Sequence, residues 1–243
     1  MALPIAYLPV IVPGVVLAAA NTARDIDEFE SAVAKQVRPK TPKQTARMIG
    51  LFFAQPTSEI TKSTIIPKLS DWHHRSDDHI HFYFPGYVTT ELSDHLAAVQ
   101  VNFEPNRPWF YSPVLFERFR KKIQEQSTWT WTGGVDLVLA RATFTGNQTR
   151  ARADFSAAMV LQLDKMKKDE AVVSIEMFFE EIVQFAEKYD GNDPIGAFSN
   201  KKGWKVAGAA LKESALGALP GKTGAHYKKA EHFAVQNLAL TTV

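Results

Sequence analysis

The run MIGLFFA, residues 48–54, places an uncharged, largely apolar stretch between Arg47 and Gln55. A strand that is covered on both faces has such a continuous run, whereas a strand with one solvent face alternates apolar and polar residues. This run is therefore predicted to be the central strand of a sheet. The chain of 243 residues, 45% hydrophobic and 22% charged, has the composition of an ordinary globular protein.

The residues that follow predict alternating helices and strands. QPTSEITKSTII predicts a helix capped by Thr57 or Ser58, which Pro67 kinks or splits before it ends near His74. HIHFYFP has period-two alternation, which indicates a strand with one apolar face. Ser112 as cap and Pro113 as first residue begin a second helix. Its apolar stripe comprises Leu115, Phe116, Phe119 and Ile123.

GVDLVLARATF and DFSAAMVLQLD predict two strands of a hairpin, and VSIEMFFEEIVQFAEKYDGN predicts a helix that stops near Gly191. The fold class is therefore α/β: a Rossmann-like three-layer core with a mixed sheet, antiparallel at one edge, and a helical C-terminal extension. We expect an N-terminal apolar segment and charged linker in 1–46, the core domain in 47–190, and the helical extension in 191–243. The extension has one helix around KVAGAALKESALGAL and another around HYKKAEHFAVQNLAL.

The apolar segment from Ala2 to Ala20 can be interpreted as a targeting or membrane segment, or as an extended piece that packs on the domain or on a partner subunit. Three prolines interrupt it and no Lys or Arg precedes it, which disfavours a signal peptide and a spanning helix. We therefore expect a cytoplasmic protein with no membrane span.

Histidines and aspartates are concentrated in DWHHRSDDHIH, residues 71–81. On a strand, His79 and His81 point the same way, and Asp77 can complete a set of nitrogen and oxygen ligands for a divalent metal. The sequence contains no HExxH motif and supplies no further ligand. The same residues also fit a hydrophilic helix end and turn.

A second candidate site follows from topology, because open α/β sheets bind ligands beyond the carboxyl ends of their parallel strands. Gln55, Thr57 and Ser58 follow the first strand, and Tyr87 follows the second. Such an edge suits a nucleotide-like ligand or another anion. Ordinary capping and turn formation account for the same residues.

STWTWTGGVDL, residues 127–137, places Trp129 and Trp131 before a double-glycine turn and Asp136 before an apolar run. The tryptophans fit core or interface anchors better than a stacking site. Asp136 is the candidate acid or base, since a carboxylate at the start of a buried strand needs a partner. A turn-forming role for Asp136 is the alternative.

Three stretches carry a resemblance: IIPKLSDWHHRSDDHIHFYFPGY, WTWTGGVDLVLA and DFSAAMVLQL. Together they resemble uncharacterised bacterial open reading frames with a Rossmann-like core, a group associated with accessory genes that include antiviral defence. The resemblance spans residues 47–190. It implies a bacterial origin and an α/β fold, and it assigns no functional residue.

Two functions are therefore expected. The first is a soluble sensor or interaction module that binds a nucleotide-like ligand or a protein partner, including a second copy of itself. The second is a metal-dependent hydrolase or nuclease that uses the cluster at 71–81, with Asp136 as the proton acceptor. The absence of cysteine excludes thiolate chemistry, and a net charge of +2 argues against a nucleic-acid partner despite the basic C-terminal helices.

Overall fold

The computed structural model places two sheets and several helices in the described part of the chain. It describes residues 29–31, 33–34, 37–76, 79–89, 97–102, 108–125, 127–145, 150–201, 232–233 and 235–239. The larger sheet has the order β2-β1-β6-β7, with β1 at Ala46–Phe53, β2 at His81–Tyr83, β6 at Asp136–Thr145 and β7 at Arg150–Gln162. The smaller sheet has the order β3-β5-β4, with β3 at Tyr87–Thr89, β4 at Val99–Gln100 and β5 at Trp109–Tyr111. The helical elements are η1 (Thr61–Ile65), η2 (Ile66–Lys68), α3 (Leu69–Ser76), α4 (Pro113–Glu125), α5 (Leu163–Lys168), α6 (Ile175–Lys188) and α7 (Pro194–Lys201).

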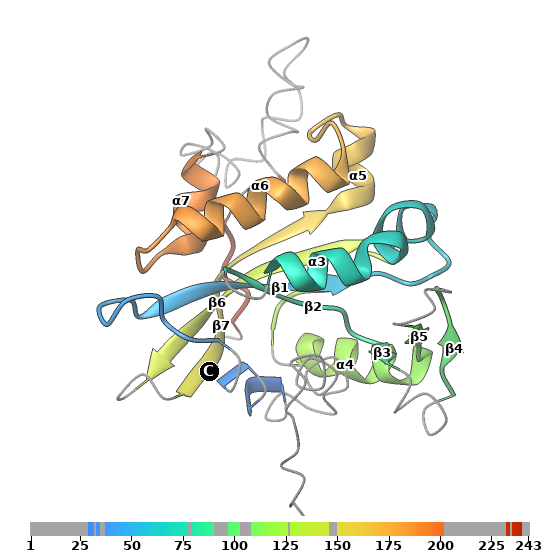
Figure 1. Cartoon of the computed structure of the whole chain (residues 1–243), viewed down its shortest axis with the longest axis horizontal. Helices are drawn as coiled ribbons and strands as arrows, with labels where there is room; N and C mark the ends of the chain where they lie inside the picture. Colours follow the sequence, from blue (N-terminus) through green and yellow to red (C-terminus); the bar gives the residue numbers. More distant parts are fainter. Residues whose placement is uncertain are drawn as a thin grey trace, which may run out of the picture.

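Strand β1 is buried along its whole length and lies between β2 and β6, which confirms the prediction from the apolar run. Its alternate side chains contact different helices. The Phe52 ring lies 6.2 Å from Phe179 of α6, and Phe53 lies 6.2 Å from Phe116 of α4. Figure 1 shows α6 and α4 on opposite sides of the larger sheet. Helix α3 lies on the α6 side, because Trp72 stacks on Phe179 at 4.2 Å.

The larger sheet is mixed, as predicted. Strands β1 and β2 are parallel, whereas the β1–β6 and β6–β7 pairs are antiparallel. The connection between the parallel strands is helical, and Pro67 lies in the short 3-10 turn η2 that separates η1 from α3. This agrees with a helix split at Pro67. The α/β class is therefore confirmed, while the Rossmann-like assignment is not, since the sheet has a single parallel pair among its named strands.

The two long helices α4 and α6 form as the sequence indicates. The Leu115 N–H donates to Ser112 Oγ at 3.3 Å, and the predicted apolar stripe of α4 is buried. In α6, the Met177 N–H donates to Ser174 Oγ at 3.0 Å, and Ile175, Phe178, Phe179, Ile182 and Phe185 are buried. Helix α6 ends at Lys188, before Gly191.

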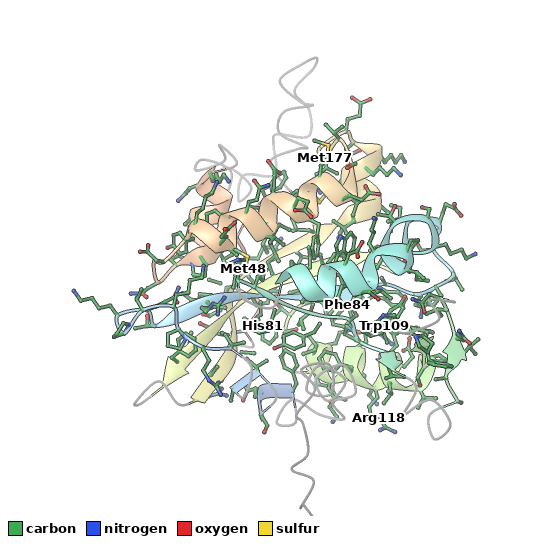
Figure 2. The ribbon with its side chains drawn as sticks, in the orientation of Figure 1. Met48, His81, Phe84, Trp109, Arg118 and Met177 are labelled. Atoms are coloured by element: carbon green, nitrogen blue, oxygen red, sulfur yellow. The ribbon has the colours of Figure 1, made fainter. Side chains whose placement is uncertain are left out.

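Strand β2 differs from the expectation of one apolar and one polar face. Residues 80–84 are all buried, including His81, which has 6% of its surface exposed. Helices α3 and α6 cover one face. Phe29 covers the other, with its ring 5.1 Å from that of Tyr83. The alternation of HIHFYFP therefore separates two buried faces of different polarity, and Figure 2 shows His81 inside the molecule.

The charged linker predicted up to residue 46 is partly built into the core. Gln44 and Arg47 are buried, and Arg47 Nη1 donates to the Arg38 carbonyl at 2.8 Å. Phe29 and Val33 are fully buried members of the same hydrophobic core. The core therefore begins before residue 47. Residues 1–28, with the apolar segment, lie outside the described residues, and no helix within the described ones is long and apolar enough to cross a membrane.

Residues 235–239 correct the prediction of a final helix. Gln236 and Ala158 of β7 exchange two backbone hydrogen bonds, of 2.7 and 2.9 Å, so this segment is extended and antiparallel to β7. The outer edge of β7 presents unpaired N–H and C=O groups, and pairing with them outweighs the modest helical pattern of the segment. The extension begins with α7, a helix that lies before the two expected ones, and the helix expected around KVAGAALKESALGAL lies outside the described residues.

Candidate functional site

The strand register brings Asp136 to the edge of the sheet where β1 ends. Asp136 pairs with Phe53 in β1 and with Gln162 in β7. Because β6 is antiparallel to both neighbours, its first residue lies beside the last residues of β1 and β7. The candidate ligand-binding residues that follow β1 and β2 therefore lie at the same end of the sheet as Asp136. They are Gln55, Thr57, Ser58 and Tyr87.

Gln55, Thr57 and Ser58 form the turn that leaves β1 at this edge. The Ser58 N–H donates to the Gln55 carbonyl at 3.1 Å, and the Lys62 N–H donates to the Ser58 carbonyl at 3.0 Å. Thr57 is exposed, whereas Gln55 and Ser58 are half-buried. These contacts belong to turn and helix formation, and a ligand at this position stays a prediction.

Tyr87 lies at the same edge, but it is fully buried. Its hydroxyl donates to the Ala54 carbonyl at 2.9 Å, which ties the start of β3 to the end of β1. Burial raises the pKa of the Tyr87 phenol well above its ordinary value, and Tyr111 adds to the rise. The phenol therefore stays neutral and acts as a hydrogen-bond donor, and its predicted role in ligand binding stays untested.

Asp136 is fully buried and holds the loop before β6. Its carboxylate accepts a hydrogen bond from the Thr132 N–H at 3.1 Å and another from Thr132 Oγ at 2.5 Å. Burial raises the pKa of this carboxyl, hydrogen bonds from Thr132 and Trp129 partly offset the rise, and Asp164 adds to it. A carboxyl whose pKa is raised by burial can accept a proton near neutral pH more readily than an exposed one.

This raised pKa predicts a pH-dependent contribution to stability. Since the folded state holds the Asp136 proton more tightly than the unfolded state, its contribution is largest below the ordinary Asp pKa of about 3.9 and is lost as pH rises through the folded pKa. We expect Asp136→Asn to abolish it. The difference in free energy of unfolding between wild type and variant, measured with urea at several pH values, should decrease as pH rises. The exposed Asp190→Asn serves as control, and a difference that stays constant or increases would contradict the prediction.

The histidine cluster is only partly described. His79 is half-buried in the turn before β2, and His81 is the buried first residue of that strand. Asp77 and the side chains of residues 73–76 lie outside the described residues. Among the side chains that the structure describes, no group of three His, Asp or Glu residues is placed to hold a metal ion. The metal site at Asp77, His79 and His81 therefore stays a prediction.

A pocket of about 340 Å³ lies at the outer side of β7, where the sequence indicated no site. Its wall comes from three parts of the chain: the segment after α4, the end of β7 with α5, and the C-terminal segment. The lining residues are Thr128, Trp129, Thr130, Val160, Gln162, Lys165, Asp169, His232, Gln236 and Leu238. Strand β6 separates β7 from β1 in the sheet, and Trp129 of the pocket wall contacts Phe53 at the end of β1.

The charged groups of the pocket form a pair and a single cation. His232 Nε2 lies 3.3 Å from Asp169 Oδ2, and His232 is buried. Lys165 forms no ion pair with any residue in the described ranges. Asp136 lies behind the pocket wall, next to Trp129 and opposite Gln162. The arrangement offers one free ammonium group, an imidazole oriented by a carboxylate, and several amides and hydroxyls.

No local spacing connects these pocket residues, so the sequence did not indicate them. Asp169 and His232 are 63 residues apart, and the pairing of Gln236 with β7 lies within a segment predicted to be helical. Trp129 was identified only as an anchor, which its 4.3 Å ring contact with Phe53 confirms.

No protein-family profile matches the chain, and neither the curated proteins nor the solved structures include a match.

Proposed function

We propose that the protein is an α/β sensor or interaction module that binds a small nucleotide-like ligand in the pocket beside β7. The supporting observation is the pocket itself, with Lys165 in its wall, which forms no ion pair with the residues that the structure describes. A volume of about 340 Å³ is at the small end of the range of about 300–1,000 Å³ typical of ligand pockets. It suits a ligand the size of a single nucleotide better than a large cofactor.

The lining supplies what such a ligand requires. Lys165 provides an ammonium group for a phosphate, which is a common role for lysine. Gln162, Gln236 and the two threonines provide hydrogen-bonding groups for a sugar or a base edge. Trp129, Val160 and Leu238 provide apolar surface for a ring.

The proposal extends to the origin, location and biological role of the protein. The resemblance of residues 47–190 to bacterial reading frames with a Rossmann-like core supports a cytoplasmic bacterial protein and a role in antiviral defence. A module that binds a nucleotide-like signal and passes it to a protein partner, or to a second copy of the chain, fits that role.

The first test is calorimetric titration of the purified full chain with AMP, with inorganic phosphate as a second probe. We expect Lys165→Ala to weaken AMP binding about tenfold or more, because a hydrogen bond to a charged group contributes about 1.5–3 kcal/mol. Lys168→Ala is the matched control. It removes an exposed lysine from the same helix that does not line the pocket, and we expect it to leave the affinity unchanged.

Equal effects of the two substitutions, or no binding of AMP or phosphate, would contradict the proposed site. A stoichiometric divalent ion that copurifies with the wild type and is lost in His79→Ala/His81→Ala would support the metal-dependent hydrolase instead. Native mass spectrometry of the same samples reports the ion, any copurified nucleotide and the number of subunits.

A further inference from the structure

Residues 235–239 lie between strand β7 and the residues that follow α4. On one side, the segment pairs with β7: Gln236 and Ala158 exchange backbone hydrogen bonds, and the Leu238 N–H donates to the Phe155 carbonyl at 2.9 Å. On its other side, the Thr128 N–H donates to the Leu238 carbonyl at 2.7 Å, next to the bridge between Ser127 and Ala239. The segment therefore spans from β7 to the residues that follow α4.

The pocket lies between these two attachments, and the segment forms its third wall. The C-terminal segment contributes His232, Gln236 and Leu238 to the lining. The residues after α4 contribute Trp129, and β7 contributes Val160. Without the segment, these two parts would form an open surface. A ligand that contacts all three walls can do so only while the segment is docked.

The beginning of the segment is anchored both outside the pocket and in its wall. Ser199 Oγ donates to the Phe233 carbonyl at 2.6 Å, and the Phe233 ring lies 5.8 Å from that of Phe178. The pair of His232 with Asp169 lies in the pocket wall itself. The groups that dock the segment and the groups that line the pocket are therefore neighbours along one short stretch of chain.

We propose that residues 232–233 and 235–239 belong to a strap whose docking on β7 and the binding of the nucleotide-like ligand are coupled. The inference rests on the proposed function, since it assigns a regulatory element to that pocket. If the strap is docked in only a fraction of the molecules, the apparent affinity of the pocket for its ligand is that fraction of the intrinsic affinity. By the same coupling, a bound ligand increases the fraction of molecules in which the strap is docked. The position of the strap would then report whether the ligand is bound.

The absence of cysteine allows a direct test, since an introduced pair has no competing thiol. Ser127 and Ala239 face each other at the narrow position of an antiparallel pair, where Cα atoms are about 4.5 Å apart, within the range of about 4.4–6.8 Å for disulfides. Neither residue lines the pocket. Oxidation of the variant Ser127→Cys/Ala239→Cys therefore locks the strap without replacing a lining residue, and the reduced variant controls for loss of the Trp129 N–H bond to Ser127 Oγ.

We expect the oxidised variant to bind AMP at least about threefold more tightly than its reduced form, with slower dissociation in stopped-flow measurements. The single variant Ser127→Cys, treated with the same oxidant, should show no change. Ser199→Ala, which loosens the strap outside the pocket, should weaken AMP binding about two- to tenfold. Ser63→Ala, which removes a similar hydroxyl-to-carbonyl bond in the helix after β1, should not.

The outcomes separate the two proposals. If the oxidised and reduced forms bind AMP with the same affinity, the proposed binding in the pocket stands and the proposed coupling to the strap is refuted. Failure of the two cysteines to form a disulfide would overturn it as well, because the docked arrangement requires their proximity. Absence of AMP binding in every form, including the wild type, would refute the proposed function and with it the coupling.

Discussion

Replacing Phe52 with alanine is expected to lower the free energy of unfolding by about 3–5 kcal/mol, the usual cost of removing a buried phenylalanine. Phe52 is 1% exposed and lies where β1, β2, α3 and α6 meet. Its ring lies 5.8 Å from that of Trp72, 5.1 Å from that of Phe84 and 6.2 Å from that of Phe179. The substitution therefore leaves a cavity between rings that also contact one another, and they cannot all move to fill it.

Urea denaturation followed by circular dichroism measures this loss. Phe144→Ala is the matched control, since Phe144 is the same residue type on β6 but only partly buried, and we expect it to cost less. Met177→Ala removes a side chain that is 62% exposed and should have almost no effect. Figure 2 shows Met177 at the outer surface of the molecule. Similar losses for Phe52→Ala and Phe144→Ala would contradict the central position assigned to β1.

The second large effect is expected at Gly86, in the turn that joins β2 to β3. Gly86 has a φ of +85°, and an added Cβ would lie 2.9 Å from Phe116 Cβ and 3.0 Å from the Ser112 carbonyl oxygen. Left-handed backbone costs a non-glycine residue about 1–2 kcal/mol, and overpacking costs about 1–3 kcal/mol more. Gly86→Ala should therefore lower the free energy of unfolding by about 2–5 kcal/mol.

Gly133→Ala separates these two costs. Gly133 has almost the same φ, +86°, but an added Cβ would have no atom within 4 Å. It should show the backbone cost alone, and the difference between the two variants measures the crowding against α4. The same urea titration applies, and equal losses at both positions would show that the turn at Gly86 is not packed as closely as the structure indicates.

The sequence predicted those elements whose stability depends on local pattern. The uniform run at β1, the Ser112 cap of α4 and the two apolar runs of the β6–β7 hairpin each carry their own signal, and all form as predicted. The smaller sheet was not predicted, because its strands are only two or three residues long and depend on pairing between distant segments. Hydrophobic periodicity cannot indicate a strand over so few residues.

The candidate site was predicted less completely, and for the same reason. Asp136 could be identified as a buried carboxylate from the apolar run that follows it, and the structure confirms its burial. The pocket depends on contacts such as that between Asp169 and His232, which no pattern along the chain reveals. Amphipathicity indicated a helix near Gln236, whereas the open edge of β7 determines an extended conformation.

The late position of the strap also has a consequence for synthesis on the ribosome. Strand β7 ends at Gln162, whereas its outer neighbour lies around Gln236, so β7 is complete long before its outer neighbour is made. During that interval the hydrogen-bonding groups of Ala158 are exposed on an open strand edge, which can pair with other nascent chains. A nascent chain of this protein therefore passes through a stage at which aggregation competes with folding, and pairing of Gln236 with Ala158 ends that stage.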